Sequence, residues 1–185
     1  MYLIILGPPG AGKGTQSILI AEKLGLKHLS TGEILRKAVT DGTPLGLKAK
    51  EVMDAGNLVS DDIMVGIIKD AISADDAKKG FILDGFPRTI EQAKELDNIM
   101  ESLGYETAKV INITLDDNEL IRRMLGRGRV DDTEDTIKNR LNVYKAQTAP
   151  VREHYSTKSA VFDIYGIGSI SEINGKILDV LKLPA

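Results

Sequence analysis

Residues that could bind phosphate gather near the start of the chain, in the run Gly7-Pro8-Pro9-Gly10-Ala11-Gly12-Lys13-Gly14-Thr15-Gln16, directly after the apolar segment 3–6. Glycines at this spacing let backbone N–H groups converge on phosphate oxygens, and the lysine can reach the outer phosphates. Apolar residues at helical spacing follow from Ile18 to Leu24, so a helix N-terminus would face the same anion. This order of strand, glycine-rich turn, lysine and helix predicts a phosphate-binding loop rather than an ordinary strand-to-helix turn.

A second run, Leu83-Asp84-Gly85-Phe86-Pro87-Arg88-Thr89-Ile90-Glu91-Gln92, also begins at the end of an apolar segment. Ligands of open parallel sheets bind beyond the carboxyl ends of the strands, so Asp84 should face the same crevice as Lys13. A carboxylate there can orient Mg²⁺ and its waters. Read alone, Asp84 would be a turn residue and Arg88 a solvated charge, but the phosphate-binding loop favours the ligand role.

Arginines cluster in the segment 122–132, and Arg140 follows on the next predicted helix. Arg123 and Arg127 are four residues apart at a predicted helix end, so both can face one ligand. The alternative is a solvated basic turn that neighbouring aspartates neutralise. Because Lys and Arg total 24 against 27 Asp and Glu, with a net charge of −3, a local basic cluster favours phosphate handling.

Composition limits the possible classes of protein. A chain of 185 residues is about one domain long and can bury a proper core. With 0 Cys, a disulfide framework, a cysteine zinc site and a nucleophilic cysteine are excluded, and a cytoplasmic location is expected. The first apolar run is too short for a signal peptide or a membrane span, and the acidic balance argues against broad binding to nucleic acid.

The apolar segments alternate with long helical patterns, which indicates a parallel sheet with helices on both faces. Strands are expected at 3–6, 81–83, 110–115 and 161–164, with a short one at 27–29. Helices are expected from about 31 to 39, from about 45, after 60–62, and from 133 to about 154. We expect a single domain, 1–185, from which the helical segment 30–59 protrudes.

The runs GPPGAGKGTQ and LDGFPRT resemble the adenylate kinase family of nucleoside monophosphate kinases. Three further segments support the resemblance in the expected order, namely 29–36 (LSTGEILR), 56–59 (GNLV) and the arginine-rich run at 122–132. The resemblance covers essentially the whole chain. It implies an α/β fold, a doubly wound parallel sheet of the P-loop NTPase type, with a helical AMP-binding excursion at 30–59 and a short lid at 126–132.

The activity that the resemblance implies is a reversible, Mg²⁺-dependent phosphoryl transfer from ATP to AMP that gives two ADP, in adenine nucleotide homeostasis. ATP, AMP and ADP are then the partners of a monomer that binds neither nucleic acid nor membrane. The family holds Mg²⁺ mainly through nucleotide and water, so no protein residue is assigned to a metal. No zinc is expected, because the inserted lid domain of longer relatives and its cysteines are missing.

The resemblance also assigns roles to individual residues. Catalytic roles fall on Lys13, Asp84, Arg88, Arg123, Arg127, Arg129 and Arg140. ATP would contact Gly10, Ala11, Gly12, Lys13, Gly14, Thr15, Arg127 and Gly168. AMP would contact Thr31, Arg36, Asn57, Leu58, Val59, Gly85, Phe86, Pro87, Arg88, Gln92, Arg129 and Arg140.

The chain departs from the family pattern at a few positions. Gly14 intervenes between the lysine and Thr15, so the hydroxyl stands one place later than the usual metal-ligating position. Glu33 replaces a usual Asp, and Ser60 replaces a common Pro. His28 and His154 show no recognisable partners, so core or surface positions are expected for both.

Two alternatives stay open. A UMP/CMP kinase is the nearer one, but such kinases tend to carry Ala at the position of Thr31 and Asn at that of Gln92. A P-loop switch protein would need only one nucleotide site, and the pair Arg36 and Arg88 argues against it. An assay with ATP and each monophosphate in turn separates the three.

Overall fold

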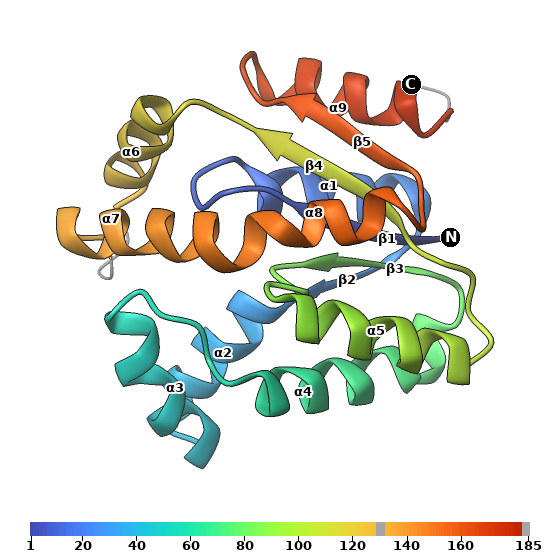
Figure 1. Ribbon diagram of the computed structural model, residues 1–185, viewed down its shortest axis with the longest axis horizontal. Coiled ribbons are helices and arrows are strands. Elements are labelled where there is room, and N and C mark those ends of the chain that lie inside the picture. Colours follow the sequence, from blue (N-terminus) through green and yellow to red (C-terminus); the bar gives the residue numbers. More distant parts are fainter. Residues whose placement is uncertain (129–131, 183–185) are drawn as a thin grey trace.

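The computed structural model describes residues 1–128 and 132–182. Five parallel strands form one sheet in the order β2-β3-β1-β4-β5. They are β1 (Tyr2–Leu6), β2 (Lys27–Ser30), β3 (Phe81–Asp84), β4 (Lys109–Thr114) and β5 (Val161–Tyr165). Strand β1 lies at the centre, with β3 and β2 on one side and β4 and β5 on the other (Figure 1), so the predicted doubly wound α/β fold is confirmed.

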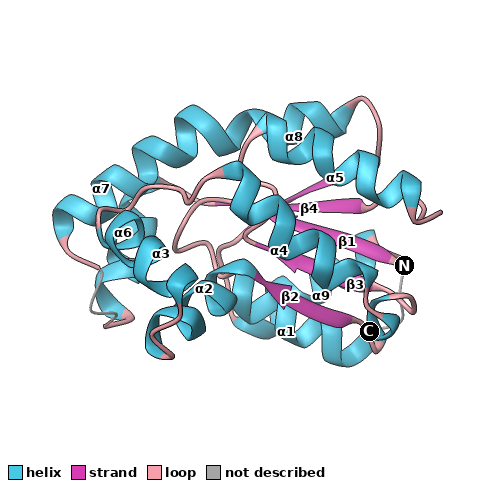
Figure 2. Cartoon of the chain, turned by 90° about the horizontal axis from the view of Figure 1, so that it is seen from below, coloured by secondary structure: helices cyan, strands magenta, loops and turns pink. Residues whose placement is uncertain are grey.

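Helices connect the strands and cover both faces of the sheet (Figure 2). Those before β4 are α1 (Lys13–Leu24), α2 (Thr31–Thr40), α3 (Pro44–Asp54), α4 (Asp61–Ser73), the 3₁₀ turn η1 (Asp75–Ala77) and α5 (Ile90–Ser102). Those after it are α6 (Asp117–Gly126), α7 (Glu134–Val143), the π-helical segment η2 (Tyr144–Thr148), α8 (Ala149–Ser156) and α9 (Ile170–Val180). No described helix is long and apolar enough to cross a membrane.

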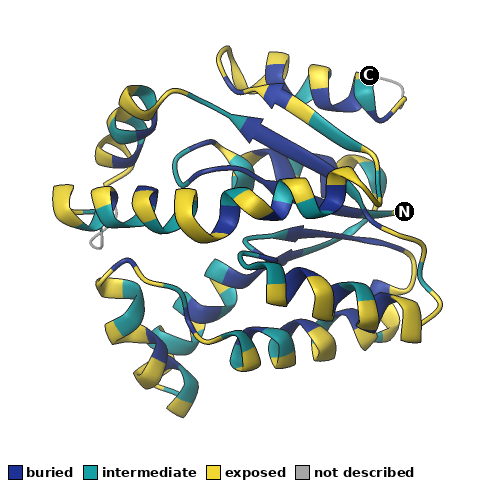
Figure 3. Cartoon of the chain, in the orientation of Figure 1, coloured by how far each residue is buried: buried dark blue, intermediate teal, exposed yellow. Residues whose placement is uncertain are grey.

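Alternation along the strands divides the core into two clusters, one on each face of the sheet. Ile4 and Leu83 pack with residues of α4, α5 and α8, whereas Ile5 and Ile82 pack with residues of α1, α6, α7 and α9. Figure 3 shows the inner strands β1, β3 and β4 as mostly buried, whereas the edge strand β5 is partly exposed and the helices expose their outer faces. Because helices cover both faces of the sheet, we expect a ligand to bind beyond the carboxyl ends of the strands.

Helices α2 and α3 extend away from the sheet as a pair (Figure 1). Ser30 and Thr43 begin them with side-chain caps, each accepting a hydrogen bond from the backbone N–H three residues later. The helices touch so closely that a Cβ atom on Gly46 would lie 2.0 Å from the Ala38 carbonyl oxygen. Only glycine fits there, and the close contact joins α2 to α3.

The helix predicted from 133 to about 154 is the segment where the local structure differs from expectation. The chain is helical there, but α7 and α8 are joined by the π-helical η2. A π segment adds a residue to one turn and shifts the faces that follow. Ile137 and Leu141 are buried before it, and Thr148, Val151 and Tyr155 are buried from its end onward.

Candidate active site

The phosphate-binding loop connects β1 to α1. Gly12 adopts a left-handed conformation with φ 91° as the N-cap of α1, which favours glycine at this position. The Lys13 ammonium folds back over the loop and donates to the carbonyl oxygens of Gly7 at 2.7 Å and Pro8 at 2.9 Å. The loop therefore presents a lysine cation and a helix N-terminus on the same side, the arrangement that binds phosphates.

A cavity of about 640 Å³ lies at the carboxyl end of the sheet and extends from this loop to α2, α3 and α7. This volume lies in the ordinary range for small-molecule sites, ~300–1,000 Å³. Among the predicted site residues, the following line it: Gly10, Gly12, Lys13, Gly14, Thr15, Thr31, Arg36, Asn57, Leu58, Val59, Asp84, Gly85, Pro87, Arg88, Gln92, Arg123, Arg127 and Arg140. Segments far apart in the sequence thus share one cavity.

Three of the predicted residues that the structure describes do not line this cavity. Ala11 and Phe86 are 1% exposed and pack in the core clusters instead of lining the cavity. Gly168 lies before α9, where its neighbours Ile167 and Ile170 are exposed. Arg129 lies outside the described residues.

The turn after β3 is held by the carbonyl oxygen of Gly85. It accepts hydrogen bonds from the Thr31 hydroxyl at 2.9 Å and from Arg88 Nε at 2.8 Å. Gly85 has φ 83°, and a Cβ atom there would lie 2.7 Å from the Thr31 hydroxyl oxygen. Thr31 is 1% exposed, and because its proton is engaged, it offers a ligand only acceptor lone pairs.

The Gln92 side chain is 1% exposed and has a protein partner on each polar atom. Its Oε1 accepts from the backbone N–H of Arg88 at 2.7 Å, and its Nε2 donates to Asp61 Oδ1 at 2.8 Å. The second oxygen of Asp61 accepts from the Thr89 hydroxyl at 2.9 Å. Gln92 also lines the cavity, so this buried network ends at the cavity wall.

Arg88 of this turn interacts electrostatically with one arginine from each of two helices, Arg36 of α2 and Arg140 of α7. Burial lowers the pKa of Arg88, Asp84 raises it, and the nearby charges of Arg140 and Arg36 lower it further. A guanidinium keeps its proton despite such shifts because its ordinary pKa is so high. The three arginines therefore keep their positive charges close together. An anion bound between them would stabilise this cluster.

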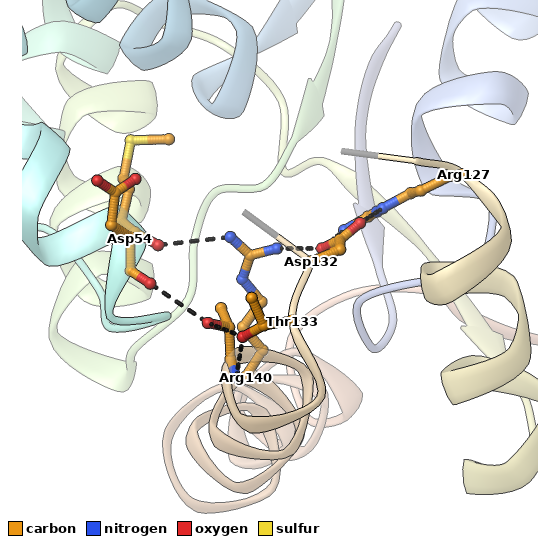
Figure 4. A network of polar contacts seen from close by, with 7 residues as sticks. Asp54, Arg127, Asp132, Thr133 and Arg140 are labelled. Atoms are coloured by element: carbon orange, nitrogen blue, oxygen red, sulfur yellow. Dashed lines mark hydrogen bonds and ion pairs between the residues drawn. The ribbon is translucent and has the colours of Figure 1, made fainter. Parts of the chain in front are cut away.

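Asp132 pairs with two of the predicted lid arginines (Figure 4). Its carboxylate binds Arg127, and it accepts from Arg140 at 2.7 Å. The Asp132 side chain is only 1% exposed. Arg140 also donates to the carbonyl oxygen of Met53 at 3.4 Å, so it lies between the α3 end and the segment before α7.

Arg123 is positioned by contacts on both sides of its guanidinium. Its Nε pairs with Glu119 at 2.7 Å and an Nη donates to the Gly166 carbonyl at 3.0 Å. Hydrogen bonds from Arg122, and then from Arg123, lower the pKa of Glu119 to about 2. Glu119 is therefore ionised at neutral pH and fixes Arg123 at the edge of the cavity.

Helix α7 contacts the end of α3 directly. Asn139 donates to the Ala55 carbonyl at 2.7 Å and to Asn57 Oδ1 at 3.0 Å, and Thr136 donates to the Asp54 carbonyl at 3.3 Å. These bonds join the protruding helical pair to the segment that follows the lid arginines. Residues of both segments, Met53 of α3 and Arg140 of α7 among them, line the cavity.

The carboxylate of Asp84 lies beside the phosphate-binding loop, since a Cβ atom on Gly14 would come 3.3 Å from its Oδ2. A single carboxylate with water and nucleotide oxygens is a donor set that suits Mg²⁺. Within the described residues, no group of three or more His, Cys, Asp or Glu side chains could hold a metal ion.

Sequence reasoning missed two acidic residues of this site. Asp61 was read only as part of a helix start, and Asp132 only as a neutralising charge in a basic turn. The sequence indicates Asp61 only indirectly. A buried side-chain amide at Gln92 needs hydrogen-bond partners, and its own segment cannot supply all of them. His154, for which a core or surface position was expected, lies away from the cavity, and its ring lies 2.9 Å from an Asp97 oxygen.

Comparison with known proteins agrees with this geometry. Residues 5–160 match the family model described as "Adenylate kinase". Curated relatives named adenylate kinase include one from Leptospira biflexa, 50% identical over 95% of this chain and 97% of its own. Others are from Corynebacterium aurimucosum, 46% identical over 98% and 99%, and Stenotrophomonas maltophilia, 44% identical over 98% and 100%. These matches over nearly the whole chain show that the chain belongs to the adenylate kinase family.

Proposed function

We propose that this adenylate kinase transfers a phosphoryl group from ATP to AMP by positioning both nucleotides and compensating their charge, without a covalent enzyme intermediate. The observation that carries the proposal is a single cavity that is lined both by the phosphate-binding loop and by two arginines from other segments, Arg36 and Arg88. Two separate anion sites that face one cavity suit a donor and an acceptor nucleotide. A switch protein would need only the first.

The donor end of the cavity would hold the phosphates of ATP. Backbone N–H groups of the loop and the α1 N-terminus would bind the β- and γ-phosphates, and Lys13 would follow the transferred group. Thr15 is exposed at the start of α1 and Asp84 lies beside Gly14. Mg²⁺ bound to the nucleotide, oriented by Asp84 through water, would supply charge neutralisation at the transferring phosphate.

The acceptor end would hold AMP. Arg36 and Arg88 would bind its phosphate, and Gln92 would bind its base, with Thr31 nearby. Backbone and side-chain surface for the nucleotide would come from Asn57, Leu58, Val59, Gly85, Phe86 and Pro87. Phe86 is buried, so its part is to support the turn from the core.

The chemical step needs no general base. A phosphate oxygen of AMP is already anionic at neutral pH, so it attacks the γ-phosphorus directly while the bond to the β–γ bridging oxygen breaks. Arg123, Arg127 and Arg140, with Arg129 from outside the described residues, would stabilise the charge on the transferring group. Excluding water prevents it from accepting the phosphoryl group instead.

The division of the chain follows from these roles. We propose that 30–59 is the AMP-binding excursion and 126–132 a short lid within a single domain, 1–185. ATP would also contact Ala11 through the loop backbone and Gly168 near the base. We further propose that the enzyme is a cytoplasmic monomer, which a mass measurement by light scattering would test.

Selection of the acceptor base tests the assignment most directly. A Gln amide can pair with a donor and an acceptor on the adenine edge, and mismatched polar sites can reject a ligand by up to roughly 10⁴-fold. We expect AMP to exceed UMP, CMP and GMP widely in kcat/KM. Gln92→Ala should reduce that preference without abolishing transfer, whereas Gln147→Ala, at an exposed position, should not change it.

Two results would contradict the assignment. One is wild-type enzyme that uses UMP or CMP as well as AMP. The other is a folded Gln92→Ala variant that keeps the full preference for AMP.

A further inference from the structure

The orientation of the Gln92 side-chain amide is fixed by its two partners. The Arg88 backbone N–H can only donate, and the Asp61 carboxylate can only accept. Oε1 must therefore face Arg88, at 2.7 Å, and Nε2 must face Asp61, at 2.8 Å. A rotation by half a turn would place donor against donor and acceptor against acceptor.

Asp61 is itself held in place by the start of the next helix. Thr89 caps α5: its hydroxyl oxygen accepts from the Gln92 backbone N–H at 3.1 Å. Its proton is donated to Asp61 Oδ2 at 2.9 Å. The three side chains thus form a closed ring of hydrogen bonds in which each donor has a defined acceptor.

The amide keeps one N–H and one lone pair for a ligand. Adenine presents a donor at its 6-amino group and an acceptor at N1, so it can pair with Oε1 and Nε2 of an amide. Hypoxanthine, the base of IMP, presents the reverse pattern, an acceptor at O6 and a donor at N1. An amide that could turn over would accept both bases, whereas a fixed one accepts only one of them.

We propose that Asp61 is a positioning residue that determines base specificity: it prevents the Gln92 amide from turning over and so excludes 6-oxopurine monophosphates. Asp61 touches the cavity only through Gln92. The proposal rests on the proposed role of Gln92 in reading the AMP base. Its substrate class is a purine monophosphate with an amino group at position 6.

Asp61→Asn tests the proposal with little change in size. The new carbonyl can face the Thr89 hydroxyl while the new NH₂ faces Gln92. Either orientation of the Gln92 amide then leaves one mismatched pair, at position 61 or at the Arg88 N–H, so the wild-type preference for a single orientation is lost. IMP is the probe, since its base differs from adenine only at the edge in question. We expect the ratio of kcat/KM for AMP to that for IMP to fall by at least about tenfold, the range for one mismatched buried pair.

The matched control is Asp62→Asn, which removes the same charge from the same first turn of α4 at an exposed position. Its AMP-to-IMP ratio should equal that of the wild type. A general loss of stability or of helix N-terminal charge would lower both substrates together, and would leave the ratio unchanged in both variants.

A double mutant shows whether Asp61 acts through Gln92. In a Gln92→Ala background, Asp61→Asn should no longer alter the ratio, since the amide is absent. If Asp61→Asn is poorly folded by circular dichroism, Thr89→Val, which removes the donor to Asp61, is measured instead. Its ratio should fall by at least about threefold, as expected for losing one of several buried constraints.

The outcomes separate the two levels of the argument. If Gln92→Ala keeps the AMP preference, the proposed function of Gln92 fails and the inference fails with it. If Gln92→Ala loses the preference but the folded Asp61→Asn variant retains the wild-type ratio, only the positioning role is overturned. A ratio that falls in Asp61→Asn equally with and without Gln92 also overturns it.

Discussion

The hydroxyl of Thr148 donates a 2.9 Å hydrogen bond to the backbone carbonyl of Arg88. Thr148 is the last residue of the π-helical η2, and Arg88 belongs to the turn that lines the acceptor end of the cavity. The bond links the long helical segment to the loop that would bind the acceptor phosphate. Thr148 also lines the cavity, so it can position Arg88 from within the site.

Thr148→Val keeps the side-chain shape but leaves the Arg88 carbonyl without this donor. Such a loss costs about 1–3 kcal/mol of stability. We expect a lower Tm and a higher KM for AMP, with a smaller effect on kcat. Thr157→Val, at an exposed position, is the control. An unchanged Tm and KM in Thr148→Val would show that the bond has no such role.

Lys13→Met should leave a folded protein that is nearly inactive. The charge of Lys13 would follow the transferred group, while the backbone donors of the loop remain. We expect kcat to fall at least ~10²-fold, about 2.7 kcal/mol. Steady-state kinetics with Lys23→Met, exposed on the same helix, as the control will measure this. Near-normal kcat in folded Lys13→Met would remove the lysine from the mechanism.

Arg127→Ala should impair catalysis far more than stability. Arginine contacts to a transferring phosphoryl group contribute on the order of 10³-fold in related enzymes. Stability should change little, because Asp132 keeps its bond to Arg140. Arg122→Ala removes an exposed arginine that is absent from the cavity lining and should retain activity. Comparable kcat values for Arg127→Ala and Arg122→Ala would argue against a role for Arg127. We expect Arg129→Ala to lower kcat as Arg127→Ala does.

Activity should require Mg²⁺ but not zinc. Near the loop the described residues provide the carboxylate of Asp84, a ligand type that suits Mg²⁺, and the chain has no cysteine for a thiolate zinc site. Treatment with a zinc-selective chelator should leave kcat unchanged, and removal of Mg²⁺ should abolish turnover. Loss of activity with the chelator, restored by zinc, would contradict this prediction.

Gly46→Ala should disrupt the contact between α2 and α3. Its Cβ would lie 2.0 Å from the Ala38 carbonyl oxygen, so the two helices must separate. We expect a loss of more than about 2 kcal/mol, since overpacking of this kind costs ~1–3 kcal/mol or more. Gly66→Ala, where no atom lies within 4 Å of the new Cβ, should instead stabilise α4 by up to about 1 kcal/mol. Chemical denaturation of both variants gives the comparison.

Most of the fold could be predicted because its signals are local. The apolar run before Gly7 and the capping pair Ser30 and Glu33 each specify an element within a few residues. The η2 segment could not be predicted, since its sequence reads as an ordinary helix. Its geometry follows from partners far along the chain, such as the Arg88 carbonyl.

The same distinction applies to the candidate site. Lys13 and Arg88 belong to short sequence motifs that are typical of phosphate binding, so the sequence alone predicted them. Asp61 and Asp132 are acidic residues at helix starts, where a capping or solvated role is the ordinary reading. Their bonds to Gln92 and Arg140 depend on the packing of separate segments, which no local pattern encodes.

The η2 segment has a consequence for how the gene can tolerate insertions and deletions. An α-helix turns by about 100° per residue, so the extra residue of a π turn sets the angle between the faces of α7 and α8. Deleting one residue within 144–148 would keep the segment helical but rotate α8 against the sheet. Val151 and Tyr155 would leave the core together, and Thr148 would turn away from Arg88. A reading-frame-preserving deletion of one codon should therefore be harmful here, in a region whose sequence looks like an uninterrupted helix.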